Sequence, residues 1–355
     1  MLPDIIKQFF PNDHVVDIKP FGNGHINTTY KLELESTGAC YILQKINTDV
    51  FKDPHGIAET HERLQDQVAW DQHFIEIARL IHTFDGNPLY VDADGGVWRM
   101  TSFVEDSHTI DVVEETWQAT EAGRAFGCFA FVCNALNVQE FKESITDFHR
   151  LSFRIRQLDD AIAANAAGRY DKVKHIVDFF KDRERQMSYI EQLVDRGEIP
   201  LRVVHNDTKI NNLLFRGNKA VAVIDLDTVG PGILYYDYGD ALRTSANTAE
   251  EDEKDLSRVS FNMDAFAAFT EGYMKQVSPI LSAHEEKFFY MAPFLMTYIM
   301  GIRFLADYLN GDVYYKIAHA DHNIDRCKVQ KKLIESMEQN EEKMKETINL
   351  KLVAS

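Results

Sequence analysis

The chain has few of the features that mark secreted, membrane or zinc-binding proteins. Only four cysteines occur in 355 residues, at Cys40, Cys128, Cys133 and Cys327, and their spacing matches no zinc or redox motif. No run reaches about 18 consecutive apolar residues, and the N-terminal residues lack a basic region followed by an apolar stretch. We therefore expect a cytoplasmic protein with free thiols, neither secreted nor inserted in a membrane.

Positive charge is also scarce. The 38 Lys and Arg residues face 56 Asp and Glu residues, for a formal net charge of -18. Nucleic acids and anionic membrane surfaces are bound by clustered Lys and Arg, so this balance argues against both as partners. Hydrophobic residues make up 45% of the sequence, and the length allows two domains with separate cores. A monomer is the default expectation.

The most informative residues form an H-x-D-x-x-x-x-N array of His205, Asp207 and Asn212, followed by Asp225 at the end of the apolar strand expected over residues 220–224. Phosphoryl transfer requires a carboxylate that faces the acceptor hydroxyl, and oxygen ligands for a divalent metal. Asp207 suits the first task. Asn212 and Asp225 suit Mg²⁺, which prefers oxygen ligands and retains waters. We expect His205 to hold the loop backbone.

A purely structural interpretation of this array is two strands joined by a polar turn. It is disfavoured because Asp207, Asn212 and Asp225 all lie beside β-branched or leucine-rich runs, where an unpaired carboxylate would be costly. The array therefore predicts metal-assisted phosphoryl transfer to a hydroxyl group.

The first third of the chain predicts a small β-rich lobe. Gly22, Asn23 and Gly24 lie between its first two strands, where glycines would let backbone N–H groups approach a polyphosphate. An ordinary hairpin turn is the alternative, and the absence of a following Gly-Lys-Ser or Gly-Lys-Thr excludes a Walker A loop. Strands are expected over residues 18–21, 28–35, 39–46, 88–91 and 96–104.

The chain leaves this lobe near residue 102, where we expect a hinge. The backbone of Ser102, Phe103, Val104 and Glu105 is expected to receive a purine edge. Helical periodicity runs over residues 54–77, 115–136, 153–167, 172–196, 264–277, 284–310 and 323–349. The prediction is an α+β fold with two lobes, a nucleotide-binding lobe of residues 1–105 and a mainly helical lobe of residues 106–355 that carries the catalytic and substrate-binding residues.

The array VHNDTKINN at residues 204–212, the run IDLD at 224–227 and the glycine loop resemble the aminoglycoside phosphotransferase and choline kinase superfamily. This resemblance implies a protein-kinase-like fold that uses ATP and Mg²⁺, with Asp207 as the base and with Asn212 and Asp225 as metal ligands. A resemblance to bacterial N-acetylhexosamine 1-kinases covers nearly the whole chain. It rests on the runs GHINTTY (24–30), YILQ (41–44), LRVVHNDTKINN (201–212), IDLDT (224–228), EDEKDLS (251–257), RFLADYL (303–309) and GDVYY (311–315).

Those enzymes phosphorylate the anomeric hydroxyl of N-acetylglucosamine or N-acetylgalactosamine with ATP. Sugar recognition needs directional donors and acceptors, and the resemblance makes His25, Arg303, Asp307 and Tyr314 the candidates beside Asp207. Arg303 and Asp307 stand at i, i+4 on one helical face, so a structural salt bridge is the alternative for this pair.

One position departs from the usual pattern of this fold. Many such kinases place Lys or Arg on the third strand to contact the nucleotide phosphates, but strand alternation directs Gln44 inward and Lys45 outward. A one-residue bulge would reverse this assignment. Gln44 is therefore our candidate for nucleotide contact, and a lysine pair with Glu62 on the following helix loses support.

Three further carboxylates follow the array. Asp227 is expected either to support the metal site or to form a turn before Gly230. Asp237 and Asp240 are expected to cap or brace the helix that follows them.

Two other functions stay open at this point. A kinase of choline, ethanolamine, homoserine or an aminoglycoside would need carboxylates or an aromatic cage near Asp207 for its cationic substrate. A non-catalytic nucleotide-binding protein would be marked by loss of Asp207, Asn212 or Asp225, and all three are present.

Overall fold

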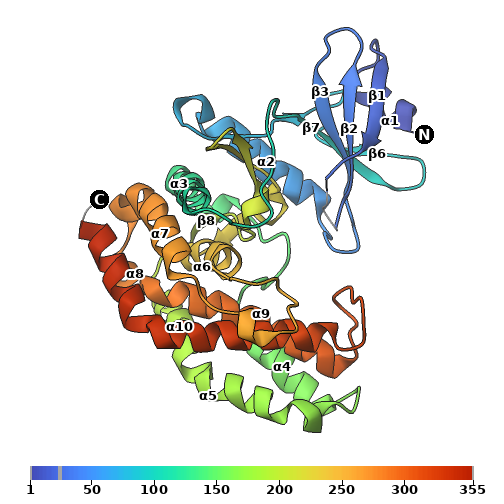
Figure 1. Cartoon of the computed structure of the whole chain (residues 1–355). Coiled ribbons are helices and arrows are strands. Elements are labelled where there is room, and N and C mark those ends of the chain that lie inside the picture. Colours follow the sequence, from blue (N-terminus) through green and yellow to red (C-terminus); the bar gives the residue numbers. More distant parts are fainter. Residues whose placement is uncertain (1, 23–25, 354–355) are drawn as a thin grey trace.

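The computed structural model describes residues 2–22 and 26–353. An antiparallel sheet in the N-terminal region stands above a larger helical part, which confirms the predicted α+β class (Figure 1). The sheet has the order β1-β2-β3-β7-β5, with β6 paired to β7. Its strands are β1 (Val15–Pro20), β2 (Thr28–Leu34), β3 (Cys40–Lys45), β5 (Leu80–Ile81), β6 (Tyr90–Val91) and β7 (Val97–Ser102).

Strand alternation gives this sheet two different faces. Helix α1 (Leu2–Phe9), which we did not predict, packs its buried Ile5 and Phe9 with Leu43 and Met100 on one face. The residues between them in the strands, including Gln44 and Arg99, are therefore on the opposite face.

The helix expected over residues 54–77 is shorter than predicted. Asp53 caps α2 (Pro54–Gln67) by accepting from the Gly56 amide, and the helix ends at Gln67. The chain then forms a 3₁₀ turn, Trp70–Gln72, and the strand β4 (Glu76–Ile77). Spacing of apolar residues predicted a helix here, but buried Ile75 and Ile77 alternate as in a strand, and β4 pairs in parallel with β10.

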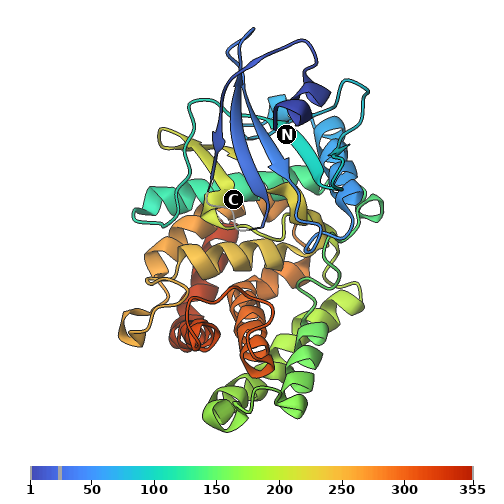
Figure 2. The ribbon, with the colours of Figure 1, turned by 90° about the vertical axis from the view of Figure 1, so that its right-hand side faces the viewer.

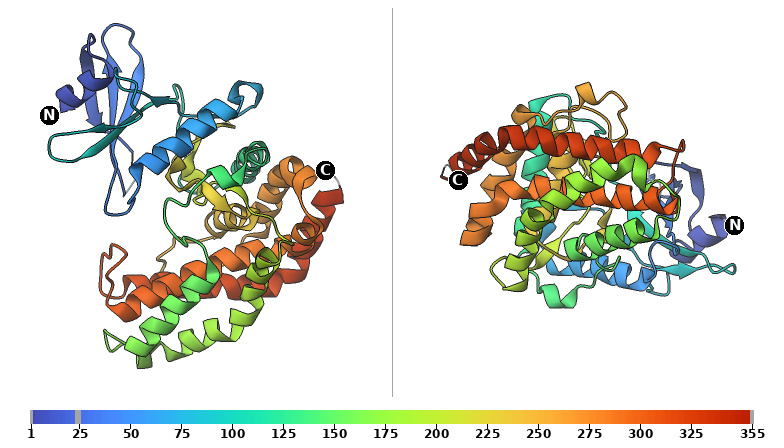
Figure 3. Two further views of the ribbon diagram at one scale, coloured as in Figure 1. Left: turned by 180° about the vertical axis from the view of Figure 1, so that it is seen from behind. Right: turned by 90° about the horizontal axis from the view of Figure 1, so that it is seen from below.

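The helical part is built around α9 (Ala292–Asn310), which packs against α4, α5, α6 and α10. Figure 3 shows α10 lying along α9 with the α4–α5 pair beside them. The predicted helices correspond to α3 (Thr116–Cys133), α4 (Leu151–Ala164), α5 (Tyr170–Asp195), α7 (Met263–Val277), α8 (Ala283–Phe288), α9 and α10 (His322–Val353), and α6 (Leu234–Ser245) lies between them.

The helix expected over residues 284–310 is interrupted by a 3₁₀ turn at Phe289–Met291, just before Pro293. By length and composition the stretch Ala283–Asn310 could cross a membrane, but 78% of its most apolar window is buried within the protein. A central core helix accounts for this composition, because it is surrounded by apolar neighbours on most sides.

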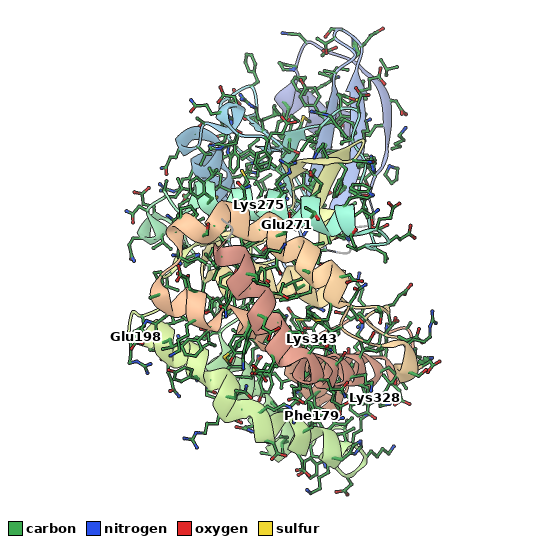
Figure 4. The ribbon with its side chains drawn as sticks, turned by 60° about the vertical axis from the view of Figure 1, so that its left-hand side comes forward. Phe179, Glu198, Glu271, Lys275, Lys328 and Lys343 are labelled. Carbon is green, nitrogen blue, oxygen red and sulfur yellow. The ribbon has the colours of Figure 1, made fainter. Side chains whose placement is uncertain are left out.

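An ion pair links the long helix α10 to α7 near its C-terminal end. Glu271 on α7 pairs with Lys275 at 2.8 Å and with Lys351 near the end of α10 at 2.9 Å. Figure 4 shows Glu271 and Lys275 on α7, with Lys328 and Lys343 along α10. Such exposed pairs each contribute about 0–1 kcal/mol, so the apolar interface between the helices stabilises their packing more than the ion pairs do.

Residues 202–232 form short strands and turns that lie between the N-terminal sheet and the helices. In Figure 2 part of this segment, in yellow, lies below the blue sheet. The strands are β8 (Arg202–Val204), β9 (Leu213–Arg216), β10 (Lys219–Val223) and β11 (Gly230–Gly232). The domain boundary after residue 105 stays a prediction, and the pairing of β4 with β10 crosses it.

Candidate active site

The loop after β8 is held by His205. This buried imidazole donates from Nε2 to the Ile224 carbonyl at 3.0 Å, and its Nδ1 accepts from the Asp207 amide at 3.3 Å. Burial lowers the pKa of His205, so the neutral tautomer implied by these two bonds is favoured. The predicted role of His205 as a support for the loop backbone is confirmed.

A second support comes from Asp237 in the first turn of α6. Its carboxylate accepts from the His205 amide at 2.8 Å and the Asn206 amide at 2.7 Å. Our expectation that Asp237 caps a following helix was wrong, because the residue lies inside α6 and binds a loop 31 residues away in sequence. Asp240 does brace this helix, through an ion pair with Arg243 at 2.9 Å.

Burial raises the pKa of Asp237 to about 7, which gives a testable pH dependence. The folded-state pKa is above the unfolded value, so this group lowers the free energy of unfolding as pH rises from about 4 to about 7. The slope is at most about 1.4 kcal/mol per pH unit. We expect Asp237→Asn to remove this component in urea unfolding at pH 5 and pH 8. Equal pH slopes in the two proteins would contradict the assignment.

Asp207 lies at the open side of this loop and is 24% exposed. Lys209 contacts one carboxylate oxygen at 2.9 Å, and the Asn212 amide donates to the other at 3.2 Å. Burial alone would raise the pKa of Asp207, but the Lys209 cation outweighs it and holds the pKa below its usual value. Asp207 is thus ionised and ready to accept a proton or a hydrogen bond. We did not predict Lys209, although its place two residues after Asp207 was a visible signal.

Asn212 and Asp225 are brought to the same place, as predicted. The side-chain nitrogen of Asn212 donates to the backbone carbonyl of Asp207 at 2.8 Å. The side-chain oxygen of Asn212 therefore points away from this bond. The Ile224 amide donates to the Asn212 backbone carbonyl at 3.0 Å and so ties together the two segments that carry the predicted metal ligands. Asp225 follows in the left-handed region, with φ of 59°.

The charges around Asp225 fit a divalent cation. Asp225 is exposed at the surface of the site, and desolvation by the surrounding protein and then the carboxylates of Asp227 and Asp207 raise its pKa to about 7. A bound cation would relieve this repulsion. The described residues contain no group of three His, Cys, Asp or Glu side chains able to hold a metal by themselves. Mg²⁺ would therefore need phosphate oxygens and water in addition to Asn212 and Asp225.

The structure also shows which of Gln44 and Lys45 faces the site. Gln44 faces the site and accepts from Arg99 Nε at 2.9 Å, whereas the Lys45 ammonium lies 5.7 Å from the Trp98 ring on the other face. Glu62 forms no lysine pair in the described structure, because it contacts His82 at 2.6 Å instead.

The predicted nucleotide-binding segments are only partly described. Gly22 has φ of 78°, a conformation suited to glycine, whereas Asn23, Gly24 and His25 lie outside the described residues. The aromatic ring of Phe21 lies edge-on to that of Phe103, at 5.8 Å.

At the predicted hinge, the Ser102 and Phe103 amides already donate to the carbonyls of Arg79 and Cys40. Within residues 2–22 and 26–353, the amides of Val104 and Glu105 have no acceptor and are the remaining donors for a purine edge. A hollow of about 480 Å³ adjoins this segment. It is lined by Glu33, Thr37, Gly38, Ala39, Cys40, Tyr41, Ser102, Phe103 and Glu105.

Comparison with known proteins agrees with this arrangement. The model of the phosphotransferase enzyme family matches residues 17–269. The chain belongs to this family.

Solved structures of phosphotransferases share the fold across nearly the whole chain. A microcompartment-associated aminopropanol kinase is 16% identical with a TM-score of 0.60, and the match covers 97% of this chain and 98% of that one. The ethanolamine kinase of Plasmodium vivax is 13% identical with a TM-score of 0.56, over 88% and 82% of the two chains. A spectinomycin phosphotransferase, solved with ADP and spectinomycin, is 13% identical with a TM-score of 0.55, over 99% and 97%. The protein-kinase-like fold is confirmed.

In this phosphotransferase, Arg303 lies near the catalytic loop through a short series of contacts. Its guanidinium is 5.1 Å from the Phe148 ring, and the neighbouring His149 contacts the Asn206 carbonyl at 2.8 Å. Arg303 is 9% exposed, and its one hydrogen bond to a described residue is to the Met300 sulfur at 3.4 Å.

The other sugar-binding candidates are placed differently. Asp307 forms no pair with Arg303. Its buried carboxylate accepts from the amides of Val313, Tyr314 and Tyr315 and from the Asn323 side chain, so it holds the loop after α9. Tyr314 is 63% exposed and contacts the ring of Tyr315.

Tyr315 was not among our candidates. Its ring lies 5.7 Å from the Arg303 guanidinium, and its buried hydroxyl has no hydrogen-bond partner among the described residues. The sequence of the loop after α9 did not indicate that Tyr315 would lie beside Arg303, because the bonds of Asp307 to the loop backbone determine how this loop folds back.

Proposed function

We propose that this phosphotransferase is an ATP-dependent kinase of N-acetylhexosamines that phosphorylates the anomeric hydroxyl with the help of Mg²⁺. The catalytic array and the family support a kinase that acts on a hydroxyl group. The chain-wide resemblance to N-acetylhexosamine 1-kinases supports the sugar, with His25, Arg303 and Tyr314 as contacts and Tyr315 added on structural grounds.

The observation that carries the choice of substrate is the uncompensated charge of Arg303. No described carboxylate pairs with this nearly buried guanidinium. A second arginine, Arg154, is close enough that burial and then the Arg303 charge lower its pKa to about 10. An ammonium group on a substrate would be repelled here, whereas hydroxyl and acetamide oxygens accept hydrogen bonds from a guanidinium. The site therefore favours a neutral, oxygen-rich substrate over an amino alcohol.

The residues of the chain have separate tasks in this reaction. Asp207 orients the 1-hydroxyl and accepts its proton as the bond to phosphorus forms. Lys209, next to Asp207, offers a cation to the transferred phosphoryl group. Asn212 and Asp225 would hold Mg²⁺, which when bound neutralises charge on the phosphates. Val104 and Glu105 offer amides to the purine of ATP.

Arg303→Ala is expected to raise KM for N-acetylglucosamine by about 10- to 100-fold, the effect of losing hydrogen bonds to a charged group. KM for ATP should change little, because Arg303 is on α9 in the helical part and has no hydrogen bond to the predicted nucleotide-binding segments that the structure describes. Steady-state kinetics with each substrate varied in turn checks this. The matched control is Arg156→Ala, which removes an exposed arginine from α4. An unchanged sugar KM in Arg303→Ala would remove this residue from the site.

The proposed function is tested directly with a substrate panel. The full-length protein is incubated with ATP, Mg²⁺ and one of N-acetylglucosamine, N-acetylgalactosamine, glucose, galactose, choline, ethanolamine, aminopropanol, homoserine or spectinomycin. NMR of the product then locates the phosphate. We expect turnover of the N-acetylhexosamines with the phosphate on the anomeric oxygen. Preferred turnover of an amine, or phosphate on another hydroxyl, would overturn the proposal.

A further inference from the structure

A buried ion pair joins the N-terminal sheet to the turn that follows Asp225. Arg99 on β7 donates to the carboxylate of Asp227, and the two side chains are only 6% and 1% exposed. Arg99 is opposite Gln44 in the strand register and also donates to its side chain at 2.9 Å. The arginine is thus oriented by its own sheet before it reaches across to the other lobe.

The second carboxylate oxygen of Asp227 is held from the same side. Asn27, the residue just before β2, donates from Nδ2 to this oxygen at 2.7 Å. The side-chain oxygen of Asn27 in turn accepts a hydrogen bond from the backbone amide of Asn47 at 2.9 Å. Both oxygens of a buried carboxylate are therefore satisfied by residues of the N-terminal region, which is what burial of a charge requires.

The turn that contains Asp227 is also held from below. The Thr228 hydroxyl donates to the His205 carbonyl at 2.8 Å, and the Asn206 side chain donates to the Thr228 carbonyl at 3.0 Å. Asp225 precedes this turn in the left-handed region, which non-glycine residues adopt mainly where their surroundings enforce it. The metal-ligand segment is thus held between the sheet and the catalytic loop.

We propose that Arg99 and Asp227 form an interlobe latch that positions Asp225 for a metal–nucleotide complex. Arg99 and Asp227 are positioning residues, since they act through the turn and through Asp225. This proposal rests on the nucleotide and Mg²⁺ use stated in the proposed function, and it is independent of the identity of the sugar.

The test measures binding of ADP by calorimetry, with excess Mg²⁺ and with EDTA, to wild type, Arg99→Met, Asp227→Asn and the double variant. We expect each variant to bind ADP about 10- to 100-fold more weakly in Mg²⁺, the usual effect of removing a support of a metal ligand. ADP affinity in EDTA should change little. Each single variant leaves a buried charge unpaired and should lower Tm, whereas the double variant should recover Tm without recovering affinity in Mg²⁺.

The matched control is a buried ion pair whose hydrogen bonds to described residues do not involve this turn. Arg202 on β8 pairs with Glu285 on α8, and the two side chains are 7% and 0% exposed. Glu285→Gln should lower Tm and leave ADP affinity in Mg²⁺ unchanged, which separates positioning from a general loss of stability.

Three results would overturn the latch. Arg99→Met could bind ADP in Mg²⁺ as tightly as wild type, or lose the same affinity in EDTA, or bind more tightly because a freed Asp227 acts as a ligand. Failure of the nucleotide and Mg²⁺ use on which the latch rests has a different signature, because wild type itself would then show no ADP binding in either condition, and failure of the sugar assignment appears only in the substrate panel.

Discussion

Asp207→Asn is expected to lower turnover of the sugar by about 10²- to 10⁴-fold, the usual contribution of a positioned general base. The amide keeps the shape of the side chain but cannot accept the proton of the acceptor hydroxyl. It also loses the charge that Lys209 contacts at 2.9 Å. Because the group acts mainly in the transition state, kcat should fall far more than the affinity for either substrate changes.

The measurement is a full set of steady-state constants together with ADP affinity and Tm. Among the described residues, the Asp207 carboxylate accepts one hydrogen bond from a side-chain amide, at 3.2 Å, and none from a backbone amide, so the folded state should tolerate the change. Asp160→Asn, on the exposed side of α4, is the control for loss of one acidic charge. Turnover within about threefold of wild type would exclude Asp207 as the base, since a positioned base contributes far more.

Asp225→Asn is expected to lower turnover by about 10²-fold or more, because the charged metal ligand is lost. The same change should leave Tm unchanged or raise it. Asp225 stands near the carboxylates of Asp227 and Asp207, and this repulsion together with the surrounding protein raises the pKa of Asp225 to about 7. At pH 8 the Asp225 carboxylate is ionised, so removing its charge removes this repulsion from the folded state.

Loss of activity together with equal or higher stability is a pattern that general unfolding does not produce. Activity measured against Mg²⁺ concentration should show a higher half-saturating concentration for Asp225→Asn. Asp111→Asn, another exposed acidic residue, should leave the Mg²⁺ dependence as in wild type. A normal Mg²⁺ dependence in Asp225→Asn would contradict its assignment as a ligand.

The catalytic loop could be predicted from the sequence because its geometry is local. His205, Asp207 and Asn212 are close along the chain, and the hydrogen bonds that join them lie within one turn. Asp225 follows directly after β10, which pairs with the strand that follows Asn212. The β2–β3 hairpin and most helices were predicted for the same reason, since periodicity and turn residues act over a few positions.

Other parts of the site were missed because they depend on contacts between distant segments. Arg99 meets Asp227 across 128 residues, and the i, i+4 spacing that paired Arg303 with Asp307 was overruled by the loop after α9. Glu62 contacts His82, the residue after β5, instead of a lysine. Packing between the two lobes brought Arg99 to Asp227, whereas contacts within one lobe placed Asp307 and Glu62.

The sequence by itself predicted the chemistry that we propose, a carboxylate base with two oxygen ligands for a metal, because Asp207 and Asn212 are close along the chain and Asp225 follows the next hairpin. The tertiary structure decided that Arg99 faces the site and how the turn after Asp225 is held. It also left Arg303 without a carboxylate partner among the described residues near the loop after β8. These outcomes depend on desolvation and on the pairing of charges from segments far apart in the sequence, and no spacing along the chain encodes them.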